Sequence, residues 1–331
     1  MTWAVLGAGS WGTALALVLA RNGHHVQLWE HDSEQATRLQ QERENRLYLP
    51  GIELPATVAV SADLDQALAD AQSILLAVPS HAFRSALEKL RPRVKPTQPL
   101  LWATKGLDAA SGGFLHHVAL ELLPQAGAFA VLSGPSFAAE VARGMPTAVV
   151  IASKNTDFAT ATAQAFHSES FRVYTSQDVI GVELGGSVKN VLAIATGISD
   201  GLGFGANARA ALITRGLAEM VRLGVALKAD PQTLMGLSGV GDLILTCTDD
   251  QSRNRRFGLA LGRGHDPAQA QCEIGTVEGV RTAAELFSLA QRTGVETPIC
   301  EQVYRILQGQ LSAGEAMGAL MRRSQKAEFD S

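Results

Sequence analysis

Short apolar runs recur along the first half of the chain, and stretches with helical spacing separate them. The runs have the length of buried strands, and this alternation predicts a mostly parallel sheet with helices on both faces. The predicted strands cover residues 2–6, 26–30, 57–60, 73–78, 100–103, 128–132 and 148–151, with 171–174 as a further candidate.

The pattern changes near Asp178, where strand signals fade and long helical patterns begin. These patterns cover residues 179–199, 206–227, 277–292 and 301–307. Pro231, Pro267 and Pro298 stand near expected helix starts, where proline is common. We therefore predict an α/β domain at residues 1–180 and an all-α domain at residues 181–331.

Composition agrees with this plan, because 331 residues are enough for two domains with substantial cores. Hydrophobic residues make up 46% and charged residues 18%, which is typical of a compact globular protein. The net charge of −4 gives no general attraction to nucleic acid or to an anionic membrane. An anionic ligand would therefore need local positive groups, and we expect neither nucleic acid nor membrane as a partner.

The cysteines and the N-terminus indicate a cytoplasmic protein. Cys247, Cys272 and Cys300 are few, odd in number and widely spaced, so they predict neither a disulfide framework nor a zinc site. Nor do the histidine pairs at 24–25 and 116–117 have the spacing of a known metal site. The chain opens into a predicted strand without the basic region of a signal peptide, and we expect no apolar run long enough to cross a bilayer.

Residues 183–197, ELGGSVKNVLAIATG, place Lys189 on a helix of small residues that we interpret as otherwise uncharged. Burial there would favour the neutral amine, so that Lys189 could exchange a proton near neutral pH. The alternative is a lysine that extends from the helix to solvent. Taken alone, the stretch fits either interpretation.

Gly7, Gly9 and Gly12 follow the first predicted strand and precede a predicted helix over residues 13–20. In this context the first glycine allows a tight turn, the second lets the backbone approach a pyrophosphate, and the third lets the helix pack on the strand. The new helix also offers free N–H groups to phosphates. The pattern predicts a Rossmann-like dinucleotide site in the N-terminal domain.

Glu30, at the end of the second predicted strand, lies where a dinucleotide fold selects its ribose. Its carboxylate could accept from a 2′-hydroxyl, which favours NAD. His31 could instead face a 2′-phosphate or stack on adenine, so the choice between NAD and NADP stays open.

At the level of motifs, the chain resembles the NAD(P)-dependent glycerol-3-phosphate dehydrogenases of the soluble bacterial type from about residue 2 to about residue 320. The most specific match is GSVKN at 186–190 continuing through GISDGLGFGAN at 197–207. Ser187 stands where the family pattern leads us to expect alanine or threonine. Further matching blocks are TKG at 104–106, LSGPSFA at 132–138, GVGDL at 239–243, SRN at 252–254 and VEG at 277–279.

The resemblance implies a homodimeric two-domain enzyme that reduces dihydroxyacetone phosphate to sn-glycerol 3-phosphate for phospholipid synthesis. It assigns proton transfer to Lys189 and places Phe83 near the nicotinamide side. It implies substrate contacts at Lys105, Gly134, Ser136, Lys189, Asp242, Ser252, Arg253 and Asn254. It implies cofactor contacts, besides the glycines, at Ser10, Trp11, His31, Lys105, Ala138, Arg253 and Glu278.

The chemistry of this reaction fits these residue types. Hydride addition to a ketone leaves negative charge on oxygen, which an ammonium such as Lys189 can stabilise and protonate. Lys105 follows a predicted strand, where open α/β sheets bind ligands. A second ammonium would lower the proton affinity of Lys189, whereas the carboxylate of Asp242 would raise it. Asp242 could equally be a helix N-cap, with Thr246 on the same helix face.

The phosphate of the substrate needs a different donor set. Arg253 offers a planar fork suited to phosphate, and Ser252 and Asn254 add neutral hydrogen bonds. We expect at most one or two of the arginines at 253, 255 and 256 to point inward. The sequence GPS at 134–136 could begin a helix whose free N–H groups face the ligands.

Two alternatives accompany this hypothesis. The two-domain plan also resembles 3-hydroxyacyl-CoA and 6-phosphogluconate dehydrogenases, although no His–Glu pair is laid out as in the hydroxyacyl enzymes. A dinucleotide fold can also serve as a non-catalytic sensor. The presence of both Lys189 and Arg253 argues against a sensor.

Overall fold

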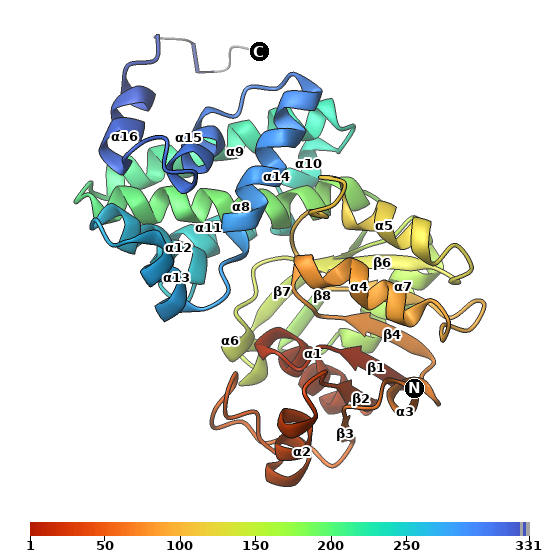
Figure 1. The fold of residues 1–331 in the computed structure, drawn as a ribbon. Helices are drawn as coiled ribbons and strands as arrows, with labels where there is room; N and C mark the ends of the chain where they lie inside the picture. Colours follow the sequence, from red (N-terminus) through yellow and green to blue (C-terminus); the bar gives the residue numbers. More distant parts are fainter. Residues whose placement is uncertain (325–326, 329–331) are drawn as a thin grey trace.

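All the apolar runs of the N-terminal half form strands, and in the described residues they join in one eight-stranded sheet (Figure 1). The computed structural model describes residues 1–324 and 327–328. The strands are β1 (Thr2–Leu6), β2 (His25–Trp29), β3 (Val58–Ser61), β4 (Ser73–Leu76), β5 (Leu100–Trp102), β6 (Phe129–Ser133), β7 (Thr147–Ala152) and β8 (Phe171–Ser176). Their order is β3-β2-β1-β4-β5-β6-β7-β8, and β6–β7 is the antiparallel pair. The predicted mostly parallel sheet is confirmed.

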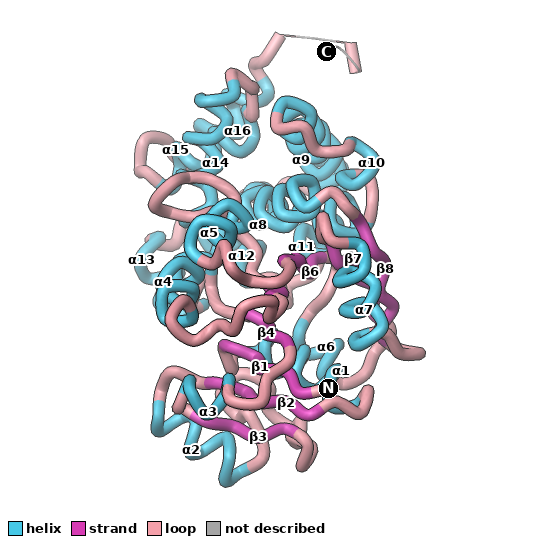
Figure 2. The backbone as a smooth tube through the Cα atoms, turned by 90° about the vertical axis from the view of Figure 1, so that its right-hand side faces the viewer, coloured by secondary structure: helices cyan, strands magenta, loops and turns pink. Residues whose placement is uncertain are grey.

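Helices cover both faces of this sheet (Figure 2). The reason is that its strands carry apolar side chains on both sides. One core layer joins the sheet to α1, α2, α6 and α7, and the other joins it to α3, α4 and α5. These helices are α1 (Ser10–Arg21), α2 (Ser33–Glu42), α3 (Leu64–Leu68), α4 (Ser80–Leu90), α5 (Leu115–Leu122), α6 (Ala138–Ala142) and α7 (Thr156–Phe166).

Two helix starts differ from the prediction. Helix α1 begins at Ser10 rather than at residue 13, so the glycine motif runs into its first turn. Helix α6 begins at Ala138, not at residues 134–136. Gly134 adopts φ 139°, a conformation outside the helical region that glycine tolerates, and the chain stays irregular until Phe137.

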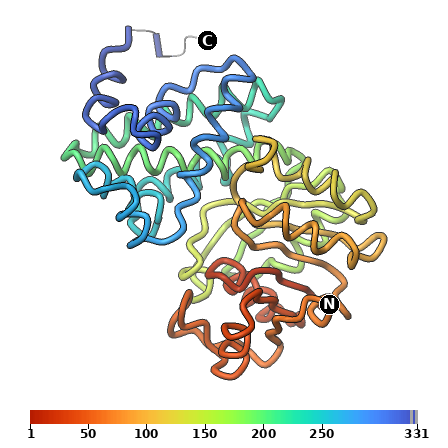
Figure 3. The backbone as a smooth tube through the Cα atoms, in the orientation of Figure 1, coloured from red at the N-terminus to blue at the C-terminus, as the bar shows by residue number. Residues whose placement is uncertain are grey.

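The rest of the described chain is helical and forms the second body in the tube view (Figure 3). The last strand ends at Ser176 and α8 begins at Val179. The division at residue 180 stays a prediction, and residues 325–326 and 329–331 of the second predicted domain lie outside the described residues. The helices are α8 (Val179–Gly201), α9 (Ala206–Ala226), α10 (Pro231–Leu234), a π-helical turn (Leu237–Gly241), α11 (Asp242–Thr248), α12 (Arg253–Gly262), α13 (Pro267–Ile274), α14 (Glu278–Thr293), α15 (Pro298–Leu307) and α16 (Ala313–Met321).

Helix α8 runs through the centre of this body and corrects two expectations. Its 23 residues are long and apolar enough to cross a bilayer by length and composition, contrary to our expectation that no run would be. Because 94% of its apolar window is buried inside the protein, it is a core helix. It also carries Glu183, which is buried, so Lys189 is not a lone charge on an uncharged helix.

Helices α8 and α12 cross in very close contact, because each presents two glycines four residues apart. A Cβ atom on Gly197 would lie 2.2 Å from the backbone oxygen of Arg255, and one on Gly258 would lie 2.1 Å from that of Ile194. Gly201 and Gly262 repeat the contact one turn later. The crossing therefore fixes the position of α12, which begins with Arg253 and Asn254, relative to Lys189 on α8.

Replacing Gly258 with alanine will destabilise the protein. The added methyl group meets backbone rather than a movable side chain, so we expect a loss of about 2 kcal/mol or more in the free energy of unfolding. Denaturant unfolding of Gly258→Ala measures it. The matched control is Gly314→Ala in α16, where a Cβ atom meets nothing within 4 Å. Equal stability of the two variants would contradict the proposed close contact.

Candidate functional site

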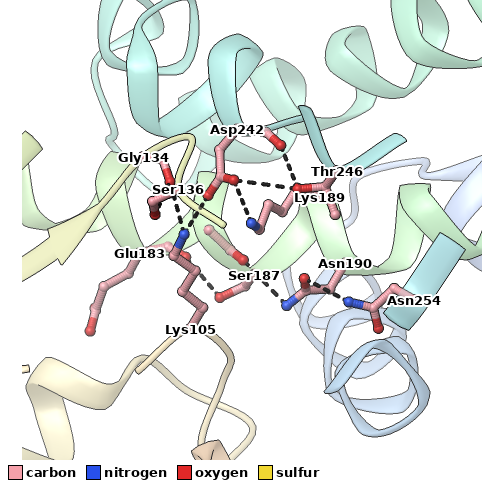
Figure 4. A network of polar contacts seen from close by, with 11 residues as sticks. Lys105, Gly134, Ser136, Glu183, Ser187, Lys189, Asn190, Asp242, Thr246 and Asn254 are labelled. Atoms are coloured by element: carbon pink, nitrogen blue, oxygen red, sulfur yellow. Dashed lines mark hydrogen bonds and ion pairs between the residues drawn. The ribbon is translucent and has the colours of Figure 1, made fainter. Parts of the chain in front are cut away.

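The buried carboxylate of Asp242 lies between two lysine ammonium groups (Figure 4). Lys105 follows strand β5, Lys189 lies in the middle of α8, and Asp242 is the first residue of α11. Lys105 Nζ is 2.6 Å from Oδ2 of Asp242, and Lys189 Nζ is 2.5 Å from Oδ1. Asp242 is 0% exposed and Lys189 8%. The prediction that Lys189 is buried is confirmed, and the lysine does not extend to solvent.

The pKa of Lys189 falls to about 8, because burial disfavours its charged form. Asp242 opposes this shift in the pKa, and Lys105 adds to it. Burial raises the pKa of Asp242, but the two ammonium groups outweigh that effect and hold it below its ordinary value. At neutral pH the site therefore contains an ionised carboxylate and an amine that can exchange a proton.

Hydrogen bonds fix this group of charges to both domains. Lys105 Nζ donates to the carbonyl oxygen of Gly134 at 3.0 Å, and Ser136 Oγ donates to the same oxygen at 2.9 Å. The Thr246 hydroxyl lies 2.6 Å from the backbone oxygen of Asp242 and 3.3 Å from its Oδ1. Of the predicted substrate residues, Lys105, Gly134, Ser136, Lys189 and Asp242 therefore form one network.

Asn254 is hydrogen-bonded to Asn190, the residue after Lys189 on α8. Its Nδ2 donates to Oδ1 of Asn190 at 3.0 Å, and its own Oδ1 accepts from the backbone N–H of Gly279 at 2.8 Å. Sequence reasoning did not name Asn190 as a site residue. Its signal was an amide directly beside Lys189 on a helix made largely of small and apolar residues.

Of the three neighbouring arginines, one is buried and two are exposed. Arg255 is buried and pairs with Asp200 on α8 at 2.5 Å and with Asp250 at 2.9 Å. Arg253 and Arg256 are exposed. Ser252 is the N-cap of α12, and its Oγ accepts from the backbone N–H of Arg255 at 3.2 Å. We expected at most one or two of these arginines to point inward, and Arg255 is the one that does. Arg253 is exposed at the start of the helix.

The glycine loop has the features that a dinucleotide phosphate requires. A Cβ on Gly12 would lie 1.8 Å from the backbone oxygen of Gly7, so helix and strand pack too closely for a side chain. Gly9 faces open space and is the N-cap of α1 without any side-chain capping bond. The first turn therefore offers N–H groups to an anion. Trp11 adds a buried indole N–H that has no hydrogen-bond partner among the described residues.

The other predicted cofactor residues lie on several different elements. Glu30 is buried, and its Oε1 lies 2.6 Å from Nδ1 of the exposed His31 and accepts from the backbone N–H of Asp32. Ala138 begins α6, which packs on α1. Glu278 begins α14 in the helical part. Phe83 is 0% exposed and packs edge-on against Trp102 in the core of the N-terminal part.

Glu183 is a second residue that sequence reasoning missed. Its buried Oε1 accepts from the indole N–H of Trp102 and from the backbone N–H of His116, both at 3.1 Å. Its Oε2 lies 2.5 Å from Nδ1 of His116. Since Trp102 ends strand β5 three residues before Lys105, these bonds hold α8 against the strand that positions Lys105.

A metal-binding cluster was not expected, and the described residues contain no group of three or more His, Cys, Asp or Glu residues that could hold an ion. Cys247, Cys272 and Cys300 are all free thiols.

Comparison with known proteins adds evidence from outside the chain. Two family models match: the NAD-dependent glycerol-3-phosphate dehydrogenase N-terminus over residues 2–159 and the C-terminus of the same family over residues 178–318. A glycerol-3-phosphate dehydrogenase [NAD(P)+] from Halorhodospira halophila is 58% identical over 330 residues, which is 99% of both chains. One with the same name from Alkalilimnicola ehrlichii is 59% identical over 96% of both chains.

Solved structures give the same result. The crystal structure of glycerol-3-phosphate dehydrogenase from Coxiella burnetii has a TM-score of 0.94 and 49% identity, over 97% of this chain and 99% of that one. D-mandelate dehydrogenase in a ternary complex with NADH has a TM-score of 0.65 at 15% identity, over 96% of this chain and 100% of that one. The second match shows a shared fold only.

Replacing Asp242 with asparagine will lower the pKa of Lys189 further below about 8. The carboxylate favours the protonated amine, so its loss leaves burial and Lys105 unopposed. Lysine-selective NMR titration of the two proteins measures the shift. Asp230→Asn, an exposed helix N-cap that asparagine replaces well, is the control with the same change of charge. A higher or unchanged pKa in Asp242→Asn would contradict the assigned cause.

Proposed function

The chain belongs to the NAD-dependent glycerol-3-phosphate dehydrogenase family, and we propose that the site around Lys189 interconverts dihydroxyacetone phosphate and sn-glycerol 3-phosphate. The protein is an NAD(P)-dependent oxidoreductase. The observation that carries the assignment of the site is the contact of the buried Asp242 with the buried Lys189 and the partly exposed Lys105. It sets one proton-exchanging amine against a fixed carboxylate at the carboxyl ends of the strands, where open α/β sheets bind ligands.

Lys189 is the proposed proton donor in the direction of ketone reduction. When bound, NADH or NADPH supplies the hydride. The Lys189 ammonium stabilises the negative charge that develops on the carbonyl oxygen and gives that oxygen a proton. Asp242 keeps the ammonium protonated and oriented, and Lys105 adds a second positive charge beside the substrate. In the reverse direction the neutral amine of Lys189 takes the proton from the hydroxyl group.

The phosphate of the substrate has its own proposed donors. Arg253 is exposed at the first turn of α12, so its guanidinium is accessible to a phosphate and suited to bidentate binding. Helix α12 also carries Asn254, and the Ser252 hydroxyl can still donate while its oxygen caps the helix. Gly134 and Ser136 complete the proposed substrate contacts from the other domain.

The cofactor is proposed to lie along the glycine loop. The uncapped N-terminus of α1 and the unpartnered indole N–H of Trp11 support this placement. The proposed contacts are Gly7, Gly9, Ser10, Trp11, Gly12, His31, Lys105, Ala138, Arg253 and Glu278.

Three broader proposals follow from the family. We propose that the enzyme is a cytoplasmic homodimer whose product feeds glycerophospholipid synthesis, because sn-glycerol 3-phosphate is the phosphorylated glycerol unit of those lipids. The free thiols of all three cysteines fit a reducing compartment. We also propose that residues 1–180 bind the dinucleotide and that the helical residues from 181 onward supply the proton-transferring lysine.

The direct test of the reaction uses purified protein with dihydroxyacetone phosphate and either NADH or NADPH. We expect oxidation of at least one cofactor, and its absence with both from folded protein would overturn the proposed function. A panel containing 3-hydroxyacyl-CoA and 6-phosphogluconate separates the two alternative dehydrogenase activities.

Ketone reduction will slow as pH rises through about 8, because Lys189 must be protonated to donate and its pKa lies there. Glycerol 3-phosphate oxidation, which needs the neutral amine, will show the opposite dependence. Lys189→Met will lower kcat by about 10²–10⁴-fold at every pH while it still binds cofactor. Initial rates across pH and fluorescence titration with NADH or NADPH measure these effects.

The control for this variant is Lys154→Met, which removes an exposed lysine outside the site. Turnover of Lys189→Met at the rate of Lys154→Met would contradict the proton-transfer role. If Lys189→Met lost cofactor binding as well, the lysine would instead be required for the shape of the site.

Glu30→Ala will relax discrimination against NADPH, because a buried carboxylate near the ribose repels a 2′-phosphate. We expect the ratio of kcat/KM for NADH to that for NADPH to fall. Parallel saturation curves with one fixed substrate concentration measure this ratio. Glu34→Ala removes a nearby negative charge from the first turn of α2 and serves as control. An unchanged ratio in Glu30→Ala would show that Glu30 does not read the ribose.

A further inference from the structure

Ser80 forms a partly buried hydrogen bond between the two parts of the molecule. It is the first residue of α4 and is 3% exposed. Its Oγ donates to Oε2 of Glu278 at 2.8 Å. Glu278 is the first residue of α14 in the helical part, 198 residues further along the chain. A single hydroxyl on the Rossmann-like part therefore fixes one oxygen of a carboxylate on the helical part.

Ser80 also touches the turn that presents Lys105. Gly106 follows Lys105 with φ 142°. A Cβ atom at Gly106 would lie 2.7 Å from Cβ of Ser80 and 2.9 Å from its Oγ. Because Gly106 has no side chain, Ser80 can pack directly against the backbone of this turn. The hydroxyl lies between the backbone beside Lys105 and the carboxylate of Glu278.

Glu278 is held from two sides. Its side chain is fixed by Ser80, and the next backbone N–H, that of Gly279, donates to Oδ1 of Asn254 at 2.8 Å. Glu278 also lines a cavity of about 470 Å³ whose other walls include His81 and Arg281. Oε2 accepts from Ser80, and no hydrogen bond to Oε1 is found among the described residues, so this oxygen keeps its full capacity to accept an N–H donor from a ligand.

We propose that Ser80 is a positioning residue for cofactor binding, acting through Glu278. Its hydroxyl orients the carboxylate so that Oε1 accepts a hydrogen bond from an amide or amino group of the dinucleotide. Because Ser80 and Glu278 lie on different parts of the protein, this orientation depends on how the two parts are placed. The inference rests on the proposed role of Glu278 as a cofactor contact.

A merely structural role for the same hydrogen bond predicts a different result. A bond that only joins the two parts would affect stability and all kinetic constants together. A positioning bond affects the binding of cofactor selectively, and its effect disappears when Glu278 is absent. A double-mutant cycle on the cofactor dissociation constant separates the two roles.

The cycle uses the full-length protein, Ser80→Ala, Glu278→Ala and the double variant, each titrated with NADH and with NADPH. We expect Ser80→Ala to weaken binding of the preferred cofactor about tenfold, since it removes a hydrogen bond to a charged group. The double variant will bind no more weakly than Glu278→Ala alone. KM for the cofactor will change more than kcat or KM for dihydroxyacetone phosphate. Ser85→Ala, on the same helix with a hydroxyl that bonds to Ala82, is the matched control.

The positioning role of Ser80 can be contradicted in several ways. An unchanged dissociation constant in Ser80→Ala, or additive effects in the double variant, would overturn the inference. If Glu278→Ala also binds cofactor normally, then the assignment of Glu278 as a contact is wrong, and the inference falls with it. If wild-type protein binds cofactor but does not reduce dihydroxyacetone phosphate, the proposed function fails while the cycle can still be read. Should Ser80→Ala not fold, Ser80→Cys keeps a weak donor of similar size, and its affinity must fall below that of the wild type.

Discussion

The site depends on one buried carboxylate shared by two lysines. Asp242 is fully buried, and each of its oxygens faces a different ammonium group. Burying ionised groups such as Asp242 and Lys189 is costly, and such clusters are poor stabilisers compared with apolar packing. The contribution of this cluster is electrostatic. One carboxylate between two ammonium groups leaves a net positive charge at a fixed position. That excess is what a developing alkoxide requires.

The packing around the site fixes the positions of these charged groups relative to one another. Lys105 comes from the sheet, whereas Lys189 and Asp242 come from the helical part, so the arrangement exists only if the two parts keep their relative placement. The bonds of Glu183 to Trp102 and His116 tie α8 to the sheet. Glycine contacts tie α12 to α8 on the other side. The site therefore lies within a frame that is fixed both to strand β5 and to helix α12.

Local features of this frame were predictable from sequence, and long-range ones were not. Strands and the glycine loop are encoded by apolar runs and by glycines within a few residues, and all eight strands were predicted. The pairing of Asp242 with two lysines 53 and 137 residues away depends on tertiary structure. The start of α6 was misplaced because Gly134 adopts a positive φ that its sequence does not reveal. Which arginine turns inward at 253–256 depended on Asp200, on a distant helix. Most of these distant residues could be assigned to one site from the family resemblance alone.

The residue types at the site reflect a division between proton transfer and anion binding. A guanidinium stays charged under all ordinary conditions and cannot exchange a proton at neutral pH. A buried lysine can, and the pKa of Lys189 near 8 places it in that range. Arginine is correspondingly suited to the proposed phosphate contact, because the charge of the phosphate does not change during the reaction, and Arg253 is exposed. The chain as a whole carries a net charge of −4, so attraction of an anionic substrate must come from this local group of cations. In the proposed mechanism the same lysines therefore serve the chemical step and also attract the substrate.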